Sequence, residues 1–357
     1  MNPIIQEEDW QRFVVKPEVT IAEALPILEK NPVDILLLCQ KDRQLMGTLS
    51  SKDIRQGVLS GVSFNEPCAE VADQNPITAN PKISYSEAEA IMDNGRDPSA
   101  NYLPLVDTEG RVVNLLSRYN QFQHKVDALS AVIMAGGFGK RLGDLTKELP
   151  KPLLPVAGRP IIERTLLQLR DIGIRQFYIT THYLTEKIKA HFGDGSSFGV
   201  AIEYIEEDQP LGTAGALGLI KNPSKPFLVI NGDIITKLDF HELWAFHREQ
   251  KATLTIAVRP YDYEIPYGVI ETDKTYLRAI REKPNFTCLV NAGIYIVNPS
   301  ALSSLPKQEP LDMTDLMETL LDHRLPVATF PMIEYWLDIG LEADYLKAKQ
   351  DFKENHS

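Results

Sequence analysis

The 357-residue chain contains little cysteine and no long apolar segment. Cys39, Cys68 and Cys288 are odd in number and far apart, and no C-x-x-C pair occurs, so we predict reduced core thiols instead of disulfides or zinc ligands. No window approaches the roughly 18 apolar residues of a membrane span. The first residues, MNPIIQEEDW, carry acidic charge and lack the apolar region of an export signal. These absences predict a cytoplasmic protein with no membrane partner.

The chain also lacks an excess of positive charge. Its formal net charge is −12, and it is spread over the whole length: residues 1–128 hold 12 basic and 19 acidic side chains, and the remainder 25 and 30. Neither part offers a basic surface for a polyanion, so no nucleic-acid partner is expected. The length exceeds that of one ordinary compact domain and predicts two, which we place at residues 1–125 and 129–357.

The two best-known phosphate-binding motifs are missing from a stretch that otherwise suits phosphate. Residues 131–158 read AVIMAGGFGKRLGDLTKELPKPLLPVAG. A dinucleotide fingerprint, G-x-G-x-x-G, fails because the sixth place counted from Gly137 is Leu142. A P-loop fails because Met134 stands five residues before Gly139. An ordinary glycine-rich turn with a solvated basic face remains an alternative.

What the stretch does contain is glycine and positive charge directly after an apolar run of buried-strand length. The glycines allow backbone N–H groups to approach a phosphate closely, because no Cβ blocks them. Basic side chains follow within fifteen residues of Gly137, namely Lys140, Arg141, Lys147 and Lys151. Local positive charge in an acidic protein favours a phosphorylated small molecule as the ligand.

From Ser130 onward, apolar strand patterns alternate with helical ones, which is typical of a mostly parallel sheet covered on both faces. Ligands of such sheets bind beyond the carboxyl ends of the strands. Residues 136–141, 181–183 and 231–233 each follow an expected strand, so we place the site there. The expected elements after the glycine-rich loop are helix 161–171, strand 176–180, helix 184–192, strand 201–205, helix 214–220 and strand 227–230.

Asp233 is the first candidate metal ligand. It follows an apolar strand and the small Gly232, so its carboxylate can point toward a Mg²⁺ ion that bridges triphosphate oxygens. Asp233 could instead cap a helix over 239–250, but Asp239 fills that place better. Asp338, in the stretch WLDIG, either caps the helix expected at 342–353 or supplies a second carboxylate.

These motifs together resemble the signature of the sugar-1-phosphate nucleotidylyltransferases. The resemblance rests on GG-x-G-x-RL followed by PKPLLPVAG-x-P, on NGD and W-x-D-I-G, and on Y-G-V, E-K-P and N-A-G-I-Y. It covers nearly all of residues 130–350. It implies a Rossmann-like, GT-A-like α/β domain that transfers a nucleotidyl group from a nucleoside triphosphate to a sugar 1-phosphate, with release of pyrophosphate. Many relatives have Thr or Ser where this chain has Lys140.

The resemblance assigns roles to individual residues. It implies that Asp233 and Asp338 hold Mg²⁺ and that Arg141 and Lys151 are the catalytic cations. The nucleotide-binding residues would be Ala135, Gly136, Gly137, Gly139, Gly212 and Thr213, and the sugar-binding residues Gly268, Glu282, Lys283, Asn291 and Gly293. By themselves, Glu282 and Lys283 read as a solvated surface pair, and Thr213 as the cap of a close-packed helix.

The stretch G-T-A-G at residues 212–215 looks most like the guanylyl-transferring members, so GTP with glucosamine 1-phosphate or mannose 1-phosphate is the expected substrate pair. A uridylyl- or thymidylyltransferase of the same family is an alternative. A protein of another class, a non-catalytic nucleotide sensor, is disfavoured because Arg141, Lys151, Asp233 and Asp338 are all present. An NAD-dependent oxidoreductase is disfavoured by the failed fingerprint. A homo-oligomer, dimer or tetramer, is expected.

Residues 1–125 contain two weak copies of one helix-strand-strand unit, about 66 residues apart when Gly47 is aligned with Val113. The repeat resembles an α+β tandem pair of CBS domains, which often bind adenine nucleotides. In the first copy, Ser50 and Asp53 match the ribose-binding pattern of that family, whereas the second copy has Val113, Leu116 and Tyr119 at the equivalent places. Either an adenine nucleotide binds at the first copy or the pair is a packing or dimerisation module. The expected elements are helix 20–28, strands 34–39 and 44–49, helix 86–92 and strands 102–106 and 110–116.

Overall fold

The computed structural model describes residues 4–6, 10–31, 33–94, 101–118, 126, 128–207, 209–221, 223–302 and 309–354. The chain forms two compact units. Unit 1 comprises Met1–Gln123, Arg259–Val290 and Pro331–Ile333, and unit 2 comprises His124–Val258, Asn291–Phe330 and Glu334–Ser357. No helix in the described part of the chain combines the length and the apolar character that crossing a bilayer would require.

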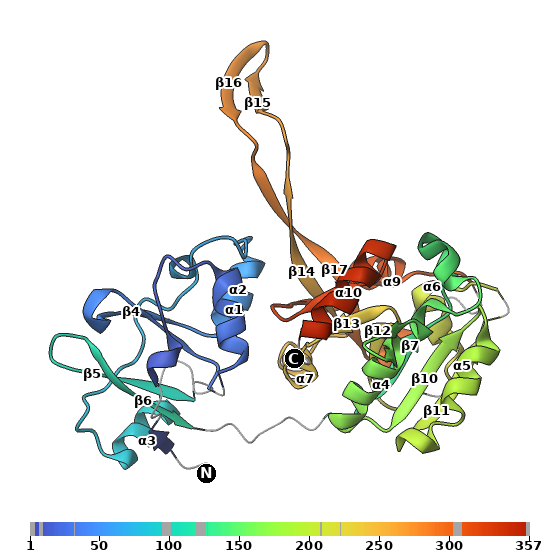
Figure 1. Cartoon of the computed structure of the whole chain (residues 1–357), viewed down its shortest axis with the longest axis horizontal. Coiled ribbons are helices and arrows are strands. Elements are labelled where there is room, and N and C mark those ends of the chain that lie inside the picture. Colours follow the sequence, from blue (N-terminus) through green and yellow to red (C-terminus); the bar gives the residue numbers. More distant parts are fainter. Residues whose placement is uncertain are drawn as a thin grey trace. The chain divides into compact units, whose positions relative to one another are not determined.

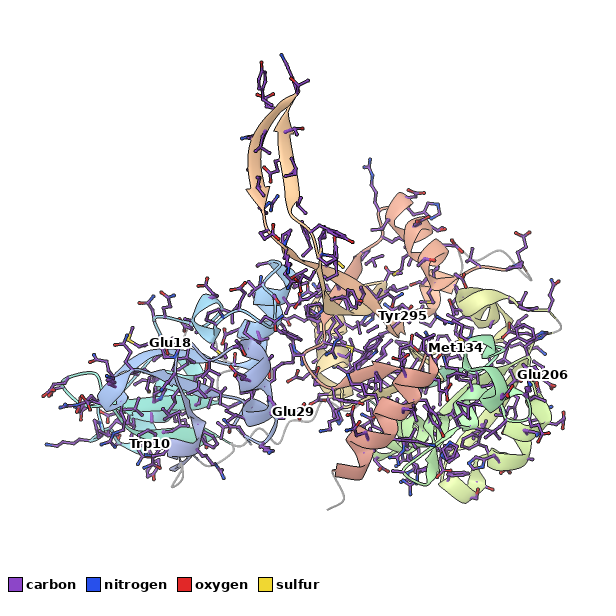
Figure 2. All side chains as sticks on the ribbon, turned by 45° about the horizontal axis from the view of Figure 1, so that its top comes forward. Trp10, Glu18, Glu29, Met134, Glu206 and Tyr295 are labelled. Carbon is purple, nitrogen blue, oxygen red and sulfur yellow. The ribbon has the colours of Figure 1, made fainter. Side chains whose placement is uncertain are left out.

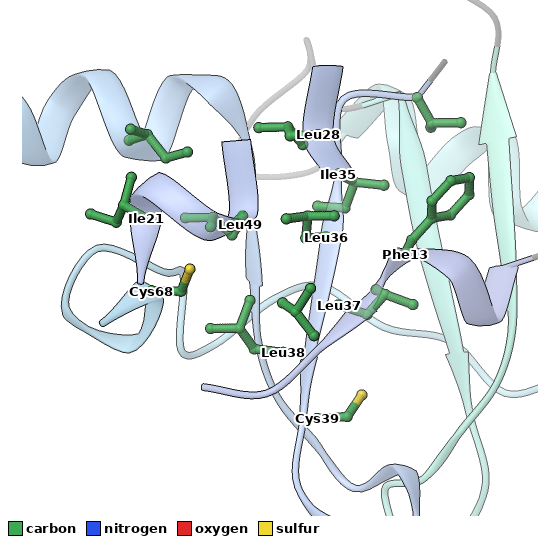
Figure 3. Close-up of a cluster of buried hydrophobic side chains, with 14 of the residues drawn as sticks. Phe13, Ile21, Leu28, Ile35, Leu36, Leu37, Leu38, Cys39, Leu49 and Cys68 are labelled. Atoms are coloured by element: carbon green, nitrogen blue, oxygen red, sulfur yellow. The ribbon is translucent and has the colours of Figure 1, made fainter. Parts of the chain in front are cut away.

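The first repeat of unit 1 packs two helices against a three-stranded sheet. Helix α1 (Ile21–Glu29), expected at 20–28, begins at a capping box formed by Thr20 and Glu23. Strands β3 (Leu36–Cys39) and β4 (Leu45–Leu49) pair antiparallel, and β2 (Val14–Val15) runs parallel to β3. Helix α2 (Ser51–Leu59) follows β4. Apolar side chains from all these elements form one buried cluster, which Figure 3 shows around Leu36, Leu37 and Leu38.

The second repeat has the same order of helix and strands, as expected. Helix α3 (Tyr85–Asn94) precedes strands β5 (Tyr102–Val106) and β6 (Val112–Arg118), and β1 (Ile4–Gln6) pairs with β6. A smaller core joins the helix and strands through Ala88, Met92, Leu103, Leu105 and Leu116. Tyr119, one of the equivalent places in this copy, lies outside the described residues.

Unit 1 also contains a β-hairpin from the second half of the sequence. Strands β15 (Val269–Asp273) and β16 (Tyr276–Arg281) pair antiparallel and turn after Asp273. They lie at the end of a ribbon made by the long strands β14 (Leu254–Glu264) and β17 (Asn285–Val297) (Figure 1). Both long strands also extend into unit 2.

Unit 2 is built on a seven-stranded sheet in the order β11-β10-β7-β12-β17-β14-β18. The first four strands are parallel, as expected, and β17 is antiparallel to β12. These strands are β7 (Ser130–Met134), β10 (Gln176–Thr181), β11 (Ala201–Glu206), β12 (Phe227–Asn231) and β18 (Val327–Pro331). Side chains crowd around Met134 and Tyr295 in this unit, whereas Glu206 lies at its surface (Figure 2).

Helices accompany the strands of unit 2. They are α4 (Ile161–Asp171), α5 (Thr185–Phe192), α7 (Phe240–Glu249), α9 (Met313–Asp322) and α10 (Glu342–Glu354). The expected helix at 214–220 is wrong in form: it is a short α6 (Gly212–Gly215) followed by a 3₁₀ turn over Ala216–Leu219. Hydrogen bonds from the Ala214 and Gly215 N–H groups to the Leu311 carbonyl hold α6 against the residues that precede α9.

The three cysteines are free thiols. Cys39 and Cys68 are buried in unit 1, and burial raises the pKa of each to about 11, which keeps the thiols neutral. The expectation of core thiols is wrong for Cys288, which is exposed because it lies in the solvent-facing half of β17, where the neighbouring Leu289 is exposed as well.

Candidate active site

The Lys151 ammonium lies beside two carboxylates of unit 2. It donates a hydrogen bond to Asp233 Oδ2, and its Nζ is 3.9 Å from Asp338 Oδ1. The Lys151 side chain is only 9% exposed, whereas those of Asp233 and Asp338 are 25% and 47% exposed. A buried lysine needs such partners, because an unpaired charge is costly away from water. The structure therefore brings together three residues that the sequence analysis singled out separately.

A tight turn after β12 places Asp233. The Gly232 N–H donates to the Met134 carbonyl at the end of the neighbouring β7, at 2.8 Å. A Cβ on Gly232 would lie 2.8 Å from the same carbonyl oxygen, so a larger residue would push the two strand ends apart. The glycine thus lets the chain turn against β7 and present the next carboxylate beyond the end of the sheet.

A two-stranded ladder places Asp338. Strands β13 (Ile234–Thr236) and β19 (Trp336–Asp338) are antiparallel, and Ile234 pairs with Asp338. The Ile339 N–H also donates to the Asp233 carbonyl, at 3.1 Å. Asp338 is therefore a strand residue held next to the turn that carries Asp233.

The groups around Asp338 have opposing effects on its pKa. Burial raises the pKa of Asp338 above its ordinary value, and the Asp233 carboxylate raises it further, whereas Lys151 and Arg141 lower it. The Arg141 guanidinium comes close to this segment, since its Nη1 lies 3.8 Å from where a Cβ on Gly340 would be. Two acids and two cations thus share one region, in which positive charge lowers the pKa of Asp338.

The glycine-rich loop leaves the sheet at the end of β7. The Ala135 N–H still donates to the Thr180 carbonyl of β10, at 3.0 Å. At Gly136 a Cβ would lie 2.9 Å from Glu207 Oε1, whereas at Gly137 it would meet nothing within 4 Å. Gly139 has φ +64°, and a Cβ there would lie 3.0 Å from Thr146 Cγ2. The backbone conformation of Gly139 requires glycine, a Cβ at Gly136 would displace the Glu207 carboxylate, and Gly137 presents an uncovered backbone.

Contacts inside the loop fix its path to Lys151. The Thr146 hydroxyl donates to the Gly139 carbonyl at 3.0 Å, within the 3₁₀ segment Lys140–Thr146 that carries Arg141. Outside this segment, the Tyr183 hydroxyl donates to the Lys147 carbonyl at 3.2 Å. The side chain of Lys140 lies outside the described part of the structure. The loop is therefore tied to the strand-end segment 181–183, which the sequence analysis also placed at the site.

The donor set fits a divalent cation. Asp233 and Asp338 supply hard carboxylate oxygens, which Mg²⁺ prefers, and both approach one cationic nitrogen, which identifies the position as one that takes positive charge. No group of three or more His, Cys, Asp or Glu side chains suited to a metal occurs among the residues that the structure describes. A cation held by two aspartates would complete its coordination with substrate phosphate oxygens and water.

The expected base-binding residues, Gly212 and Thr213, contact the residues at the start of helix α9. A Cβ on Gly212, which has φ +72°, would lie 2.6 Å from the Leu311 carbonyl oxygen. The Thr213 N–H donates to Asp312 Oδ1 at 3.1 Å, and the Thr213 hydroxyl accepts from the Met313 N–H at 2.9 Å. Thr213 does not cap α6, because the residue at the N-cap is Leu211. Base recognition by Gly212 and Thr213 stays a prediction.

Asn291 and Gly293 lie at the start of the part of β17 that belongs to unit 2. Asn291 donates to the Tyr295 hydroxyl at 2.7 Å and accepts from the Gly293 N–H at 2.8 Å. Gly293 has φ +69°, and a Cβ there would lie 2.6 Å from Asn231 Nδ2. This glycine leaves room for the Asn231 amide beside the Asp233 turn. The Asn291 side chain is oriented by its own segment, and its expected contact with a sugar stays a prediction.

Gly268, Glu282 and Lys283 belong to unit 1, at the base of the β15–β16 hairpin. Gly268 and Glu282 are neighbours across it, since a Cβ on Gly268 would lie 2.9 Å from Glu282 Oε2. Lys283 has φ +42°, an uncommon backbone conformation for a residue with a side chain. Their expected roles in sugar binding stay predictions.

Ser50 and Asp53, the predicted CBS ligand residues, form a capping box at the start of helix α2. The Ser50 hydroxyl and N–H both donate to Asp53 Oδ2, at 2.6 and 2.8 Å, and the Asp53 N–H donates back to the Ser50 hydroxyl. Burial raises the pKa of Asp53. Gly47 leaves room for the backbone at Asp73 of the same polypeptide, because a Cβ there would lie 2.7 Å from the Asp73 carbonyl oxygen. The motif therefore has a structural use, and nucleotide binding by Ser50 and Asp53 stays a prediction.

Sequence reasoning missed Glu207. Its Oε2 accepts from the Leu211 N–H at 2.8 Å, and its Oε1 faces Gly136. The His182 ring nitrogen Nδ1 lies 2.8 Å from the Glu207 carbonyl oxygen. Burial raises the pKa of the Glu207 side chain. The rule that found the other segments would have found this residue, because Glu207 directly follows β11.

Comparison with known proteins agrees with this geometry. The profile of the Nucleotidyl transferase family matches residues 130–355, and that of the CBS domain matches residues 68–120. Mannose-1-phosphate guanylyltransferase of Mycobacterium tuberculosis is 31% identical over 239 residues, which are 64% of this chain and 65% of that protein. UTP–glucose-1-phosphate uridylyltransferase of Synechocystis is 34% identical over 241 residues, or 62% of each chain.

Among solved structures, HddC from Yersinia pseudotuberculosis complexed with GMP-PN has a TM-score of 0.50 at 26% identity, over 63% of this chain and 99% of that one. The chain spans less than two thirds of the length of the two relatives named above. The match over residues 130–355 includes the loop, both aspartates and Lys151. Because this family profile covers more than half of the chain, and the mostly parallel sheet of unit 2 carries the glycine-rich loop and Asp233 beyond its strand ends, the chain belongs to the nucleotidyl transferase family.

Proposed function

We propose that this protein transfers a nucleotidyl group from a nucleoside triphosphate to a sugar 1-phosphate and releases pyrophosphate, with Mg²⁺ as the metal ion. The observation that carries the proposal is the convergence of Asp233 and Asp338 on the Lys151 ammonium, with Arg141 beside them. The reaction brings together two polyanions, and this cluster supplies the charges that such a reaction needs.

In the proposed reaction, an oxygen of the sugar phosphate attacks the α-phosphorus of the triphosphate. A new P–O bond forms, the bond to the bridging oxygen breaks, and that oxygen leaves with the electron pair as pyrophosphate. The attacking phosphate is already ionised, so no general base is required. Lys151 and Arg141 bind and orient the triphosphate, and the exposed backbone at Gly137 offers N–H donors. A Mg²⁺ held by Asp233 and Asp338 would neutralise charge on the phosphate oxygens.

We propose GTP as the donor and glucosamine 1-phosphate or mannose 1-phosphate as the acceptor. The similarity to a mannose-1-phosphate guanylyltransferase and to a structure complexed with GMP-PN supports the base. The similarity to a uridylyltransferase keeps UTP as the second candidate. We also infer a cytoplasmic homo-oligomer, dimer or tetramer; its free cysteines support a reducing compartment.

A matrix of GTP, UTP, dTTP and ATP against several sugar 1-phosphates tests the proposal, with released pyrophosphate as the readout and Mg²⁺ present. We expect the fastest release with GTP and one of the two named sugars. Fastest release with UTP or dTTP would replace the base and keep the reaction class. Release with none of these pairs would contradict the enzyme and favour a nucleotide-sensing protein.

A further inference from the structure

Within unit 1, the CBS-like repeat holds the ribbon that carries the β15–β16 hairpin. The Asp262 carboxylate of β14 accepts hydrogen bonds from Ser63 and Asn65, which follow α2, at 2.7 and 2.9 Å. Its other oxygen accepts from the Thr287 hydroxyl of β17, at 2.6 Å. Ser63 is only 7% exposed. One charged group thus ties the repeat to both strands of the ribbon.

A second tie joins the repeat to the end of β18. The Arg55 guanidinium, on α2, donates to the Pro331 carbonyl at 2.5 Å. Ile333 is 7% exposed and packs in the same apolar cluster as the first repeat. Both Arg55 and Ile333 are largely shielded from water, so this contact resembles an internal part of a fold more than a surface encounter.

From the Asp262–Thr287 pair, contacts between the two strands lead step by step to the predicted sugar-binding residues. The rings of Tyr263 and Phe286 stack with centroids 5.6 Å apart. The Ile265 N–H then donates to the Pro284 carbonyl at 3.1 Å. Gly268 and Glu282 come next, side by side. Lys283, the third predicted sugar-binding residue of unit 1, directly precedes Pro284 in the chain.

The hairpin by itself has little to fix it. Ile270, Tyr276, Leu277 and Ile280 are each more than half exposed. The Arg281 guanidinium hydrogen-bonds to Glu271, but both side chains are solvated, and such pairs contribute little. A two-stranded hairpin without a covered apolar face is marginal in water. Its order therefore depends on the ribbon, and the ribbon is fastened at Asp262.

We propose that Asp262 is a positioning residue through which the CBS-like repeat sets the conformation of the hairpin and, with it, the affinity for the sugar 1-phosphate. The effect on affinity for the sugar 1-phosphate rests on the proposed function. Asp262 acts through Glu282 and Lys283 and does not touch the substrate. Loss of its bonds to Ser63 and Asn65 frees the ribbon at the repeat, while the Lys151 cluster of unit 2 keeps its own contacts.

The first experiment needs no substrate. Amide hydrogen exchange of residues 265–284 is compared in the full chain, in Asp262→Ala, and in the double variant Ser63→Ala, Asn65→Ala. Asp262→Ala loses three hydrogen bonds to a charged group and the double variant loses two, which predicts exchange faster by about tenfold or more in both. Asp273→Asn, at the exposed hairpin turn, is the control and keeps the normal rate. Unchanged exchange in both test variants would overturn the proposal.

The second experiment uses steady-state kinetics of pyrophosphate release. We expect the KM for the sugar 1-phosphate to rise about tenfold in both test variants, with kcat and the KM for the nucleoside triphosphate within about twofold of normal. If Asp262→Ala does not fold, Thr287→Val takes its place; it removes one bond, so the KM for the sugar 1-phosphate should rise less. Equal changes in both KM values would overturn the proposal. A full chain that releases no pyrophosphate would refute the proposed function, and hydrogen exchange would still decide the role of Asp262 in holding the hairpin.

Discussion

Ile234 and Asp338 pair directly across the short antiparallel ladder of β13 and β19. This pairing sets the spacing of Asp338 from Asp233, which is next to Ile234 in the chain. The separation of the two proposed metal ligands is therefore set by backbone hydrogen bonds, and long flexible side chains are not needed to bring them together. The site can be altered at either carboxylate without changing the ladder, which makes conservative substitutions informative.

Asp233→Asn and Asp338→Asn should each fold normally and lose about 10²–10³ in turnover, because each removes one charged group that would neutralise developing charge. The measurement is pyrophosphate release at saturating substrates. Asp171→Asn, which removes an exposed carboxylate bonded to its neighbour Arg170, is the control. Near-normal turnover in both site variants would contradict the assignment.

Lys151→Met should make the protein respond more strongly to Mg²⁺. Without the ammonium, Asp233 and Asp338 face each other with less compensating charge, so a bound divalent ion stabilises the folded state more. We expect a larger rise in melting temperature on addition of Mg²⁺ than in the unaltered chain. Lys189→Met, which breaks an exposed pair with Glu206, should respond like the unaltered chain. An equal response in Lys151→Met would argue against a shared cation site.

Gly139→Ala and Gly137→Ala should separate stability from binding. Alanine at 139 has to adopt a left-handed conformation and meets Thr146, which costs about 1–2 kcal/mol in the free energy of unfolding. Alanine at 137 meets nothing, so stability should change by less than about 0.5 kcal/mol, while affinity for the triphosphate falls. Chemical denaturation and equilibrium nucleotide binding measure the two effects. Unimpaired binding in Gly137→Ala would remove that residue from the site.

Ser50→Ala should lower the free energy of unfolding by about 0.5–2 kcal/mol whether or not unit 1 binds a nucleotide, because the hydroxyl caps α2. Calorimetry with AMP, ADP and ATP addresses the ligand separately. Heat of binding in the full chain that disappears in Asp53→Ala would support the nucleotide site. No heat with any of the three would leave the repeat as a packing module.

His247 should make stability depend on pH. It is buried on α7, its Nδ1 lies 2.8 Å from the Thr255 hydroxyl oxygen, and burial lowers its pKa below the ordinary value of 6.5. The unfolded chain therefore binds a proton more readily, and this group lowers stability as pH falls through 6.5 toward the folded pKa. Above 6.5 its effect is constant. Urea unfolding from pH 5 to 8 should show a shallower acid decline in His247→Leu, and parallel curves would contradict the assignment.

Local patterns predicted much of the fold. The apolar period of residues 161–171 and the strand at 102–106 match α4 and β5 in both bounds. Their signals are local, because each helix or strand buries one regular set of side chains. Strand β13 and its pairing with β19 were not predicted, since short strands distant in sequence carry no local signal of their partner.

The candidate site was predicted only in part, again because local motifs can be recognised in the sequence and long-range contacts cannot. Arg141, Lys151, Asp233 and Asp338 stand in motifs that can be read along the chain, and the structure brings all four together. Glu207 lacks such a motif; its position directly after β11 is the signal that could have indicated it, and the structure places it against Gly136. The grouping of the β15–β16 hairpin with the CBS-like repeat depends on Asp262, whose partners lie far away in the sequence.

Because Ile333 completes the core of the first repeat and Asp262 accepts from its loop, the attachment of residues 1–123 to the ribbon does not depend on covalent continuity between residues 123 and 124. Two separately produced polypeptides cut at that peptide bond should therefore find each other and rebuild the same protein. A genetic split at this position should leave a non-covalent complex of two fragments.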